Sequence, residues 1–161
     1  MKKYELTEET VTVYGKTLYR IRAVRDFGSV KTGEFGGYIE KEENLSHFGN
    51  AWIYGDAWVY GDARVSGDAR VFDNAWVYGN AEVFNTRHFF VQGPIGSRDG
   101  YVTFYRTKDD TIGVRCGCFS GSLQEFVNQV EETHGGSRYE KEYKLAAELA
   151  KVCIRLEGES R

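Results

Sequence analysis

The chain has few of the residues that mark several common protein classes. Its 161 residues include one Pro, one Met and three Cys, and no apolar run is long enough to span a bilayer. Three cysteines cannot all pair within one chain, which suits a reducing compartment. The start Met1-Lys2-Lys3 leads into a polar segment and does not have the form of a secretory signal, so a cytoplasmic location is expected.

The chain also lacks a strong excess of either charge. Lys and Arg number 21 and Asp and Glu number 24, which gives a formal net charge of −3 at pH 7. Binding to nucleic acid or to an anionic membrane through a general surface needs a basic patch, so neither is expected here. The composition is instead rich in aromatic residues, at 15%, and in Gly, with 19 residues, and this favours short strands separated by glycine turns.

One six-residue pattern is repeated between Gly49 and Phe84. Six copies follow in one unbroken phase and read GNAWIY, GDAWVY, GDARVS, GDARVF, DNAWVY and GNAEVF. Ala at the third position and Val or Ile at the fifth lie two residues apart and face the same side of an extended strand. The Gly-Asp or Gly-Asn pair, which becomes Asp73-Asn74 in the fifth copy, favours a corner. The pattern predicts a solenoid with a small apolar interior.

These copies resemble the hexapeptide repeat of the left-handed β-helix family, in which three copies make one triangular coil. The resemblance implies a short left-handed parallel β-helix of about two coils over residues 49–86, with each residue stacked on the one eighteen positions later. The hand comes from the resemblance alone, since the general crossover rule favours the opposite hand. The aspartates of the repeat are explained by corner geometry, and a calcium-binding nonapeptide is absent, so no metal is expected.

Residues 1–48 are predicted to form an N-terminal β cap. Two β-branched and aromatic runs around Gly15-Lys16 predict a hairpin. An open solenoid end exposes unpaired strand edges and apolar core, so a preceding segment has to cover it. The stretch from Phe27 to Ser46 resembles the entry segment that precedes hexapeptide-type repeats in some bacterial and bacteriophage proteins.

Residues 87–161 are predicted to form a small α+β module with an antiparallel hairpin and two helices. Runs at 101–106 and 111–116 alternate as strands, and capping boxes at Ser122–Glu125 and Ser137–Glu140 open the helices. The sequence from Gly93 to Val152 resembles a carboxy-terminal module of bacteriophage and prophage proteins of Gram-positive hosts. That resemblance implies a phage-derived origin but no particular reaction.

The outward positions of the repeat predict a protein interface. One face stacks Trp58 on Trp76 and Tyr60 on Tyr78, and large aromatic residues are favoured interface anchors. The neighbouring face adds three further candidates, which are Trp52, Tyr54 and Phe72. Three explanations stay open: self-association as a dimer or trimer, which the family resemblance favours; docking of a host protein; and coverage by the chain's own terminal segments.

Two histidines are candidates for a general base. If the chain were a hexapeptide-family acyltransferase with an acyl-CoA donor, His47 or His88 would take the acceptor's proton. The long loop that shapes the acceptor site in such enzymes is absent, so a structural or solvent-facing His47 is the favoured interpretation.

Two other clusters are candidates for binding. Arg98, in the loop from Gly96 to Gly100, is a candidate anion-binding residue, although no phosphate-loop sequence follows it. A single residue separates Cys116 from Cys118, which is too short a spacing for a structural zinc pair, and both are expected to be buried, unpaired thiols. The role of Cys153 stays open.

Together these features favour a non-enzymatic protein-binding module without a cofactor. The phage-like resemblance suggests that it binds, and inhibits, a host protein complex such as a CRISPR effector or another anti-phage defence effector in the host cytoplasm. Two alternatives stay open. One is the hexapeptide-family acyltransferase, and the other is a phage structural or assembly protein that forms large homopolymers.

Overall fold

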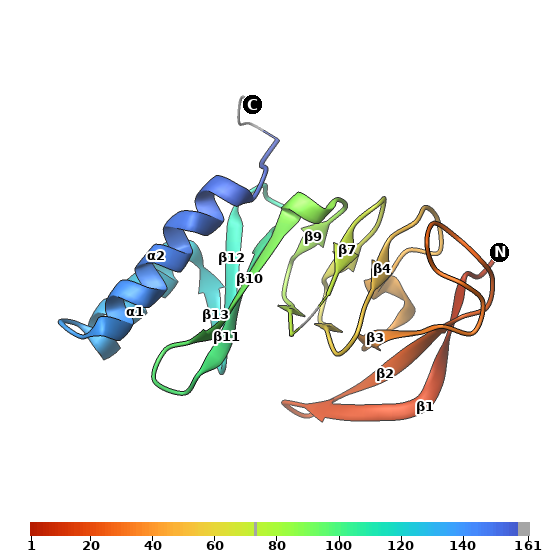
Figure 1. Ribbon diagram of the computed structural model, residues 1–161, viewed down its shortest axis with the longest axis horizontal. Helices are drawn as coiled ribbons and strands as arrows, with labels where there is room; N and C mark the ends of the chain where they lie inside the picture. Colours follow the sequence, from red (N-terminus) through yellow and green to blue (C-terminus); the bar gives the residue numbers. More distant parts are fainter. Residues whose placement is uncertain (73, 158–161) are drawn as a thin grey trace.

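Three parts of the chain lie along its longest axis in the order of the sequence (Figure 1). The computed structural model describes residues 1–72 and 74–157, so Asp73 lies outside the described residues. An N-terminal hairpin comes first, a stack of short strands follows, and a sheet covered on one side by two helices completes the chain. No helix within the described ranges is both long and apolar enough to cross a bilayer.

The repeat folds as a β-solenoid. Each copy contributes one two-residue strand, and these are β4 (Trp52–Ile53), β5 (Trp58–Val59), β6 (Arg64–Val65), β7 (Arg70–Val71), β8 (Trp76–Val77) and β9 (Glu82–Val83). β4 pairs in parallel with β7, β5 with β8 and β6 with β9. The predicted pairing of each strand with the strand three copies later is therefore confirmed, while the left hand and the number of coils stay predictions.

The third and fifth positions of every copy fill the interior of the solenoid. All twelve Ala, Val and Ile side chains at these positions are at most 1% exposed. Such small side chains bury little apolar area, but the same cluster continues into larger residues of the N-terminal segment, including Tyr4, Ile21 and Leu45. The solenoid and its N-terminal cap therefore share one core.

The N-terminal segment extends one face of the solenoid. The predicted hairpin is formed by β1 (Tyr4–Val13) and β2 (Lys16–Ala23), with Tyr14 and Gly15 at φ of 47° and 78° in the turn. β3 (Phe35–Ile39) pairs antiparallel with β2 and parallel with β5, which gives the sheet order β1-β2-β3-β5-β8. A Cβ at Gly37 would lie 2.5 Å from the Ala57 carbonyl oxygen, so only glycine allows this close approach.

The C-terminal module is a four-stranded antiparallel sheet with two helices. Its elements are β10 (Phe89–Ile95), β11 (Gly100–Arg106), β12 (Ile112–Cys116), β13 (Phe119–Ser122), α1 (Leu123–His134) and α2 (Arg138–Cys153). The sequence predicted the hairpin of β11 and β12 and did not predict β13. Gly117, at φ of 56°, permits a tight turn inside the Cys-Gly-Cys stretch, and this turn allows β13 to pair with β12.

The two predicted helix starts have different local structures. Ser122 and Glu125 form the predicted capping box at the start of α1. Ser137 precedes α2 as predicted, but its hydroxyl donates to the His134 carbonyl at 2.6 Å and caps no N–H of α2. The second predicted capping box is therefore wrong, although the helix that it introduced is present.

Candidate functional site

The predicted aromatic face is largely covered by the chain itself. The Trp58 and Trp76 rings stack with centroids 4.7 Å apart, and the Tyr60 and Tyr78 rings lie 4.6 Å apart. Tyr60 is only 1% exposed. Side chains of the N-terminal segment pack into the same cluster, and these are Val11, Val13, Leu18 and Tyr38. Of the three explanations for the aromatic face, coverage by the chain's own N-terminal segment therefore applies to much of it.

Two of the predicted interface residues are inaccessible. Trp52 is fully buried, with its ring 5.2 Å from that of Phe27 and 6.3 Å from that of Tyr4. Its prediction as an interface residue, and that of Tyr60, is corrected, because the N-terminal segment lies over outward positions that the repeat alone leaves open. The other candidates keep some exposure and stay predictions, and these are Tyr54, Trp58, Phe72, Trp76 and Tyr78.

A buried lysine closes one face at the N-terminal end of the solenoid. Lys3 is fully buried, and its Nζ donates to the carbonyl oxygens of Ala51 at 2.7 Å and Gly49 at 3.3 Å. These carbonyls point to where a preceding coil would lie. Burial, helped by the neighbouring Arg25 cation, lowers the pKa of Lys3 to about 8. Lys3 therefore supplies the hydrogen bonds that a strand of a preceding coil would make. Burial of its positive charge opposes this stabilisation.

The other two faces are closed at this end by an asparagine and by β3. Asn44 is fully buried, and its Nδ2 donates to the carbonyl oxygens of Ala63 at 2.9 Å and Gly61 at 3.1 Å. On the third face the Tyr38 backbone N–H donates to the Ala57 carbonyl at 2.9 Å. Each face of the first coil thus has donors supplied by residues 1–48, as the predicted cap requires.

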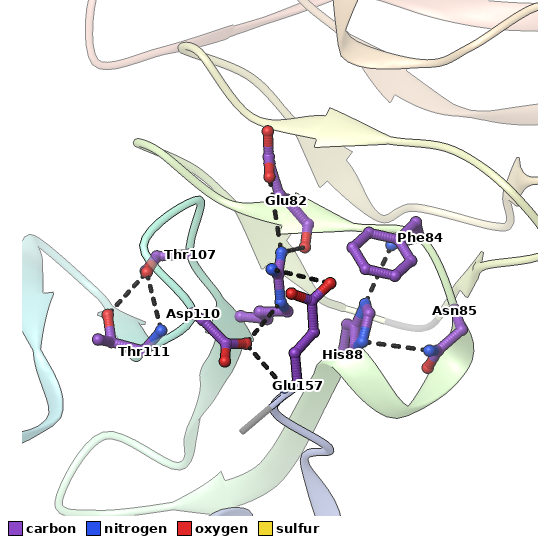
Figure 2. Close-up of polar contacts among 9 residues, drawn as sticks. Glu82, Phe84, Asn85, His88, Thr107, Asp110, Thr111 and Glu157 are labelled. Carbon is purple, nitrogen blue, oxygen red and sulfur yellow. Dashed lines mark hydrogen bonds and ion pairs between the residues drawn. The ribbon is translucent and has the colours of Figure 1, made fainter. Parts of the chain in front are cut away.

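The C-terminal module closes the opposite end in the same way. The Trp76 backbone N–H donates to Thr103 Oγ1 at 3.0 Å, and the Phe84 backbone N–H donates to His88 Nδ1 at 3.2 Å (Figure 2 for His88). These N–H groups would otherwise need a further coil. Residues of the flanking segments therefore pair with backbone groups at both ends of the solenoid.

A buried arginine joins the last strand of the solenoid to the module. Arg106 is 4% exposed, and its Nη1 donates to the Glu82 carbonyl oxygen at 3.3 Å. Its Nε donates to Asp110 Oδ1 at 3.0 Å, and its Nη2 lies 3.7 Å from Glu157 Oε1. The guanidinium also lies 4.9 Å from the centre of the Phe84 ring. Figure 2 shows the three acidic residues converging from the solenoid, the β11–β12 turn and the segment after α2.

A groove of about 470 Å³ runs along the solenoid face that carries β6 and β9. Its apolar walls include Phe48 and Phe84, which are 80% and 37% exposed. Its remaining lining comes from both solenoid and cap, and includes Glu42, Glu43, Ser46, His47, Arg64, Ser66 and Glu82. The sequence did not predict this groove, because the residues from Glu42 to Phe48 that form one wall lie before the six copies, and the Leu45–Val65 bridge that places them beside β6 is not part of the repeat pattern.

His47 lies in the groove but is held as part of the cap. Its ring stacks on Tyr4 with centroids 4.1 Å apart, and its Nδ1 accepts from the Lys3 backbone N–H at 3.2 Å. A neutral ring must then carry its proton on Nε2, which lies 3.6 Å from Glu42 Oε2. Burial lowers the pKa of His47 from its ordinary value, against an opposing effect of Glu42. The ring has no free lone pair with which to accept a proton.

His88 is equally engaged within the chain. It is 3% exposed, its Nδ1 accepts from Phe84, and its Nε2 lies 3.1 Å from Asn85 Nδ2 (Figure 2). Burial and the nearby Arg106 cation lower its pKa. Neither histidine has the exposed, unengaged nitrogen that a general base needs.

The loop that contains Arg98 does not favour an anion. It is the turn between β10 and β11, and the Gly96 backbone N–H donates to Glu142 Oε1 at 3.0 Å. A backbone donor that an anion would need is already bonded to a carboxylate, and the negative charge of Glu142 repels a second anion. This arrangement opposes the predicted site at Arg98.

The cysteines differ from one another in exposure. Cys118 is exposed, which corrects the expectation that it is buried, whereas Cys116 and Cys153 are half-buried. Burial raises the pKa of the Cys116 thiol, so it is mainly protonated at neutral pH. Within residues 1–72 and 74–157, no three His, Cys, Asp or Glu side chains are grouped so that they would hold a metal ion.

Comparison with known proteins supports the β-solenoid. The family model for the YdcK beta solenoid repeat matches residues 63–79. The protein named "Uncharacterized acetyltransferase YdcK" of Escherichia coli (strain K12) is 39% identical over 62 aligned residues, and the match covers 34% of this chain and 19% of that protein. The chain thus spans 19% of the length of this curated relative. The resemblance of the C-terminal module to phage proteins stays a prediction.

Proposed function

We propose that the chain is a non-enzymatic protein-binding module built on a short left-handed β-helix of about two coils. The observation that carries this proposal is the groove on the β6–β9 face, with Phe48 and Phe84 exposed at its walls. The flanking segments close both ends of the solenoid and cover much of the aromatic face. In this groove, exposed aromatic side chains therefore lie next to a concave surface of the solenoid.

The lining of the groove has the composition of a protein interface. Aromatic anchors beside a polar, charged rim are typical of such surfaces. Glu43 and Arg64 are exposed at the rim, and neither has an ion-pair partner within the part of the chain that the structure describes. A partner with one group of each charge and an apolar side chain between them would complement the groove.

The partner in this proposal is a host protein complex, such as a CRISPR effector or another anti-phage defence effector. The resemblance of residues 93–152 to a phage and prophage module supports this partner class. The proposal predicts that a phage lacking this protein infects defended cells poorly and undefended cells normally. Equal infection of both would contradict the anti-defence role.

A matched pair of variants tests the groove. Phe48→Ala removes an aromatic wall, whereas Phe35→Ala removes another exposed ring, 56% exposed against 80% for Phe48, at the start of β3 and outside the groove. Proteins captured from host lysate are purified, and their affinities for the wild type and both variants are measured. We expect Phe48→Ala to weaken binding at least about tenfold, as for an interface anchor, and Phe35→Ala to change it little. Equal affinities for the two variants would exclude the groove as the binding surface.

An acyltransferase is the second candidate, and it is favoured by the name of the E. coli relative and by the location of His47 in the groove. The hydrogen bond at Nδ1 and the acid facing Nε2 argue against it. A ligand that binds only the folded state raises the melting temperature, so acetyl-CoA provides a direct test. A rise in melting temperature that is lost in His47→Asn would support the enzyme, and no rise at saturation would exclude it.

A further inference from the structure

Arg115 carries a buried charge without a carboxylate. It lies on β12 and is 6% exposed. Its neighbour Val114 packs toward α1 and α2, so Arg115 faces the solenoid. Within the described ranges it takes part in no ion pair, in contrast to Arg106 with its three acidic neighbours. A buried cation is costly unless a negative or polar group compensates it, so its surroundings need an explanation.

Three tyrosines surround the guanidinium, and each comes from a different turn or strand. Its central carbon lies 4.7 Å from the Tyr14 ring centre, 5.1 Å from that of Tyr78 and 6.0 Å from that of Tyr60. Cation–π contacts of this kind satisfy the flat faces of a guanidinium. They do not satisfy the N–H groups, which point outward from its edge.

Two buried donors in this cluster have no acceptor. Arg115 Nε and the Tyr60 hydroxyl are both inaccessible, and neither has a hydrogen-bond partner among the described residues. Burial raises the pKa of Tyr60 to about 12 despite the nearby Arg115, so the hydroxyl keeps its proton at neutral pH. Buried polar groups are rarely left unpaired, and two donors together indicate a missing acceptor.

We propose that Arg115 and Tyr60 form a carboxylate-binding site, in which Arg115 Nε–H and the Tyr60 hydroxyl donate to the carboxylate oxygens. The carboxylate belongs either to a small organic acid or to an acidic side chain of a partner. The site lies on the aromatic face, away from the groove, and it does not depend on the function proposed above.

The charge and access of the site agree with this ligand class. Lys16, the nearby cation, is already bonded to Glu40 at 3.0 Å, which leaves one positive charge to match one carboxylate. Tyr14 is 60% exposed and lies in the β1–β2 turn. Rotation of this one exposed side chain would open the site, and such rotations are fast.

The test compares two Tyr→Phe variants at the same position of the repeat. Tyr60→Phe removes the unpaired donor and keeps the ring, while Tyr54→Phe makes the same change one copy earlier, outside the cluster. The probes are sodium acetate and an end-blocked peptide with one Glu, each against sodium chloride at equal ionic strength. The ¹H–¹⁵N signal of Arg115 Nε reports binding directly, and the backbone amide spectrum reports folding.

We expect the Arg115 Nε signal to shift saturably with acetate or with the peptide, but not with chloride. Loss of a hydrogen bond to a charged group should weaken binding at least about tenfold in Tyr60→Phe and leave Tyr54→Phe within about twofold of the wild type. Tighter binding of the peptide would assign the site to a partner's side chain, and tighter binding of acetate would assign it to a small acid. No saturable shift, or equal affinity in Tyr60→Phe, would overturn the proposal.

Discussion

Single buried side chains make the hydrogen bonds that a further coil would make. Lys3 and Asn44 donate to carbonyls of the first coil, and Thr103 accepts from an N–H of the last. Each is nearly or fully buried, so loss of its polar group would leave backbone groups unpaired and out of contact with water. The stability of the solenoid therefore depends on a few polar residues outside the repeat.

The charge of Lys3 predicts a specific pH dependence of stability. In the folded state its pKa is about 8, below the ordinary value of 10.5. Between these values the unfolded chain binds more protons than the folded chain, so the free energy of unfolding rises with pH. From pH 7.5 to 9.5 we expect the free energy of unfolding of the wild type to rise by on the order of 1 to 2 kcal/mol relative to that of Lys3→Met. Urea denaturation measures both values.

The comparison with Lys3→Met isolates this effect from other groups that titrate at high pH. Burial strongly raises the pKa of Tyr4, which makes the folded state lose stability only where an unfolded tyrosine ionises, near pH 10. Both proteins contain Tyr4, and its effect cancels in the difference. Parallel stability curves for the two proteins would show that Lys3 is fully protonated throughout this range.

Asn44 predicts a large loss of stability on truncation. Asn44→Ala would leave the carbonyls of Gly61 and Ala63 without their side-chain donor in a buried place. We expect a loss of about 2 to 4 kcal/mol in the free energy of unfolding, since each unpaired buried group costs about 1 to 3 kcal/mol. Asn50→Ala, at an exposed corner of the repeat, is the control and should cost less than about 0.5 kcal/mol.

The two helix starts show that one sequence motif can have different local structures. Both Ser122 and Ser137 are followed by Glu three residues later, yet only Ser122 accepts a hydrogen bond from the first turn of its helix. At α2 the preceding Gly136 adopts a φ of 81°, and the Ser137 hydroxyl turns back to the end of α1. The short connection between the helices thus sets the role of Ser137.

This difference predicts unequal effects of one substitution. Ser122→Ala removes the N-cap hydrogen bond to the Glu125 N–H and should cost about 1 kcal/mol. Ser137→Ala leaves the start of α2 unchanged and removes a bond to the C-terminal end of α1. The melting temperature followed by far-UV circular dichroism should therefore fall more in Ser122→Ala than in Ser137→Ala, and a larger fall in Ser137→Ala would contradict the observed geometry.

The closed ends of the solenoid limit how copies of the chain can assemble. Residues 1–48 lie over the first coil and the C-terminal sheet lies beyond the last (Figure 1), and both pair with backbone groups of the solenoid, which disfavours head-to-tail growth. This argues against the homopolymer expected of a phage structural component. Association through the remaining exposed part of the aromatic face would give a closed dimer or trimer instead.

Light scattering over a wide concentration range checks this prediction. We expect the mass to level off at a small closed oligomer or a monomer, because the flanking segments occupy both ends of the solenoid and leave its sides for contact. If a dimer or trimer forms, a Trp58→Ala, Trp76→Ala variant that keeps its circular dichroism spectrum should fall to monomer. Masses that grow without limit would show that an end of the solenoid opens.

Much of the architecture was predictable because its causes are local. The six-residue spacing of Gly, Ala and Val predicted the strands, their pairing three copies apart and the buried positions. Apolar spacing likewise predicted both helices, and the capping box predicted the start of α1. The candidate site was much less predictable, since the groove includes residues outside the repeat pattern and the Arg115 cluster joins segments that are far apart in the chain.

The accessibility of each outward side chain depended on contacts between distant segments. Trp52 and Trp58 occupy the same position in successive copies, yet Trp52 is fully buried beneath Tyr4 and Phe27 while Trp58 keeps partial exposure. The repeat specified which positions point outward, because side-chain direction follows from strand alternation within six residues. Which of them stay exposed was settled by long-range packing of the two flanking segments, and a local pattern carries no information about such contacts.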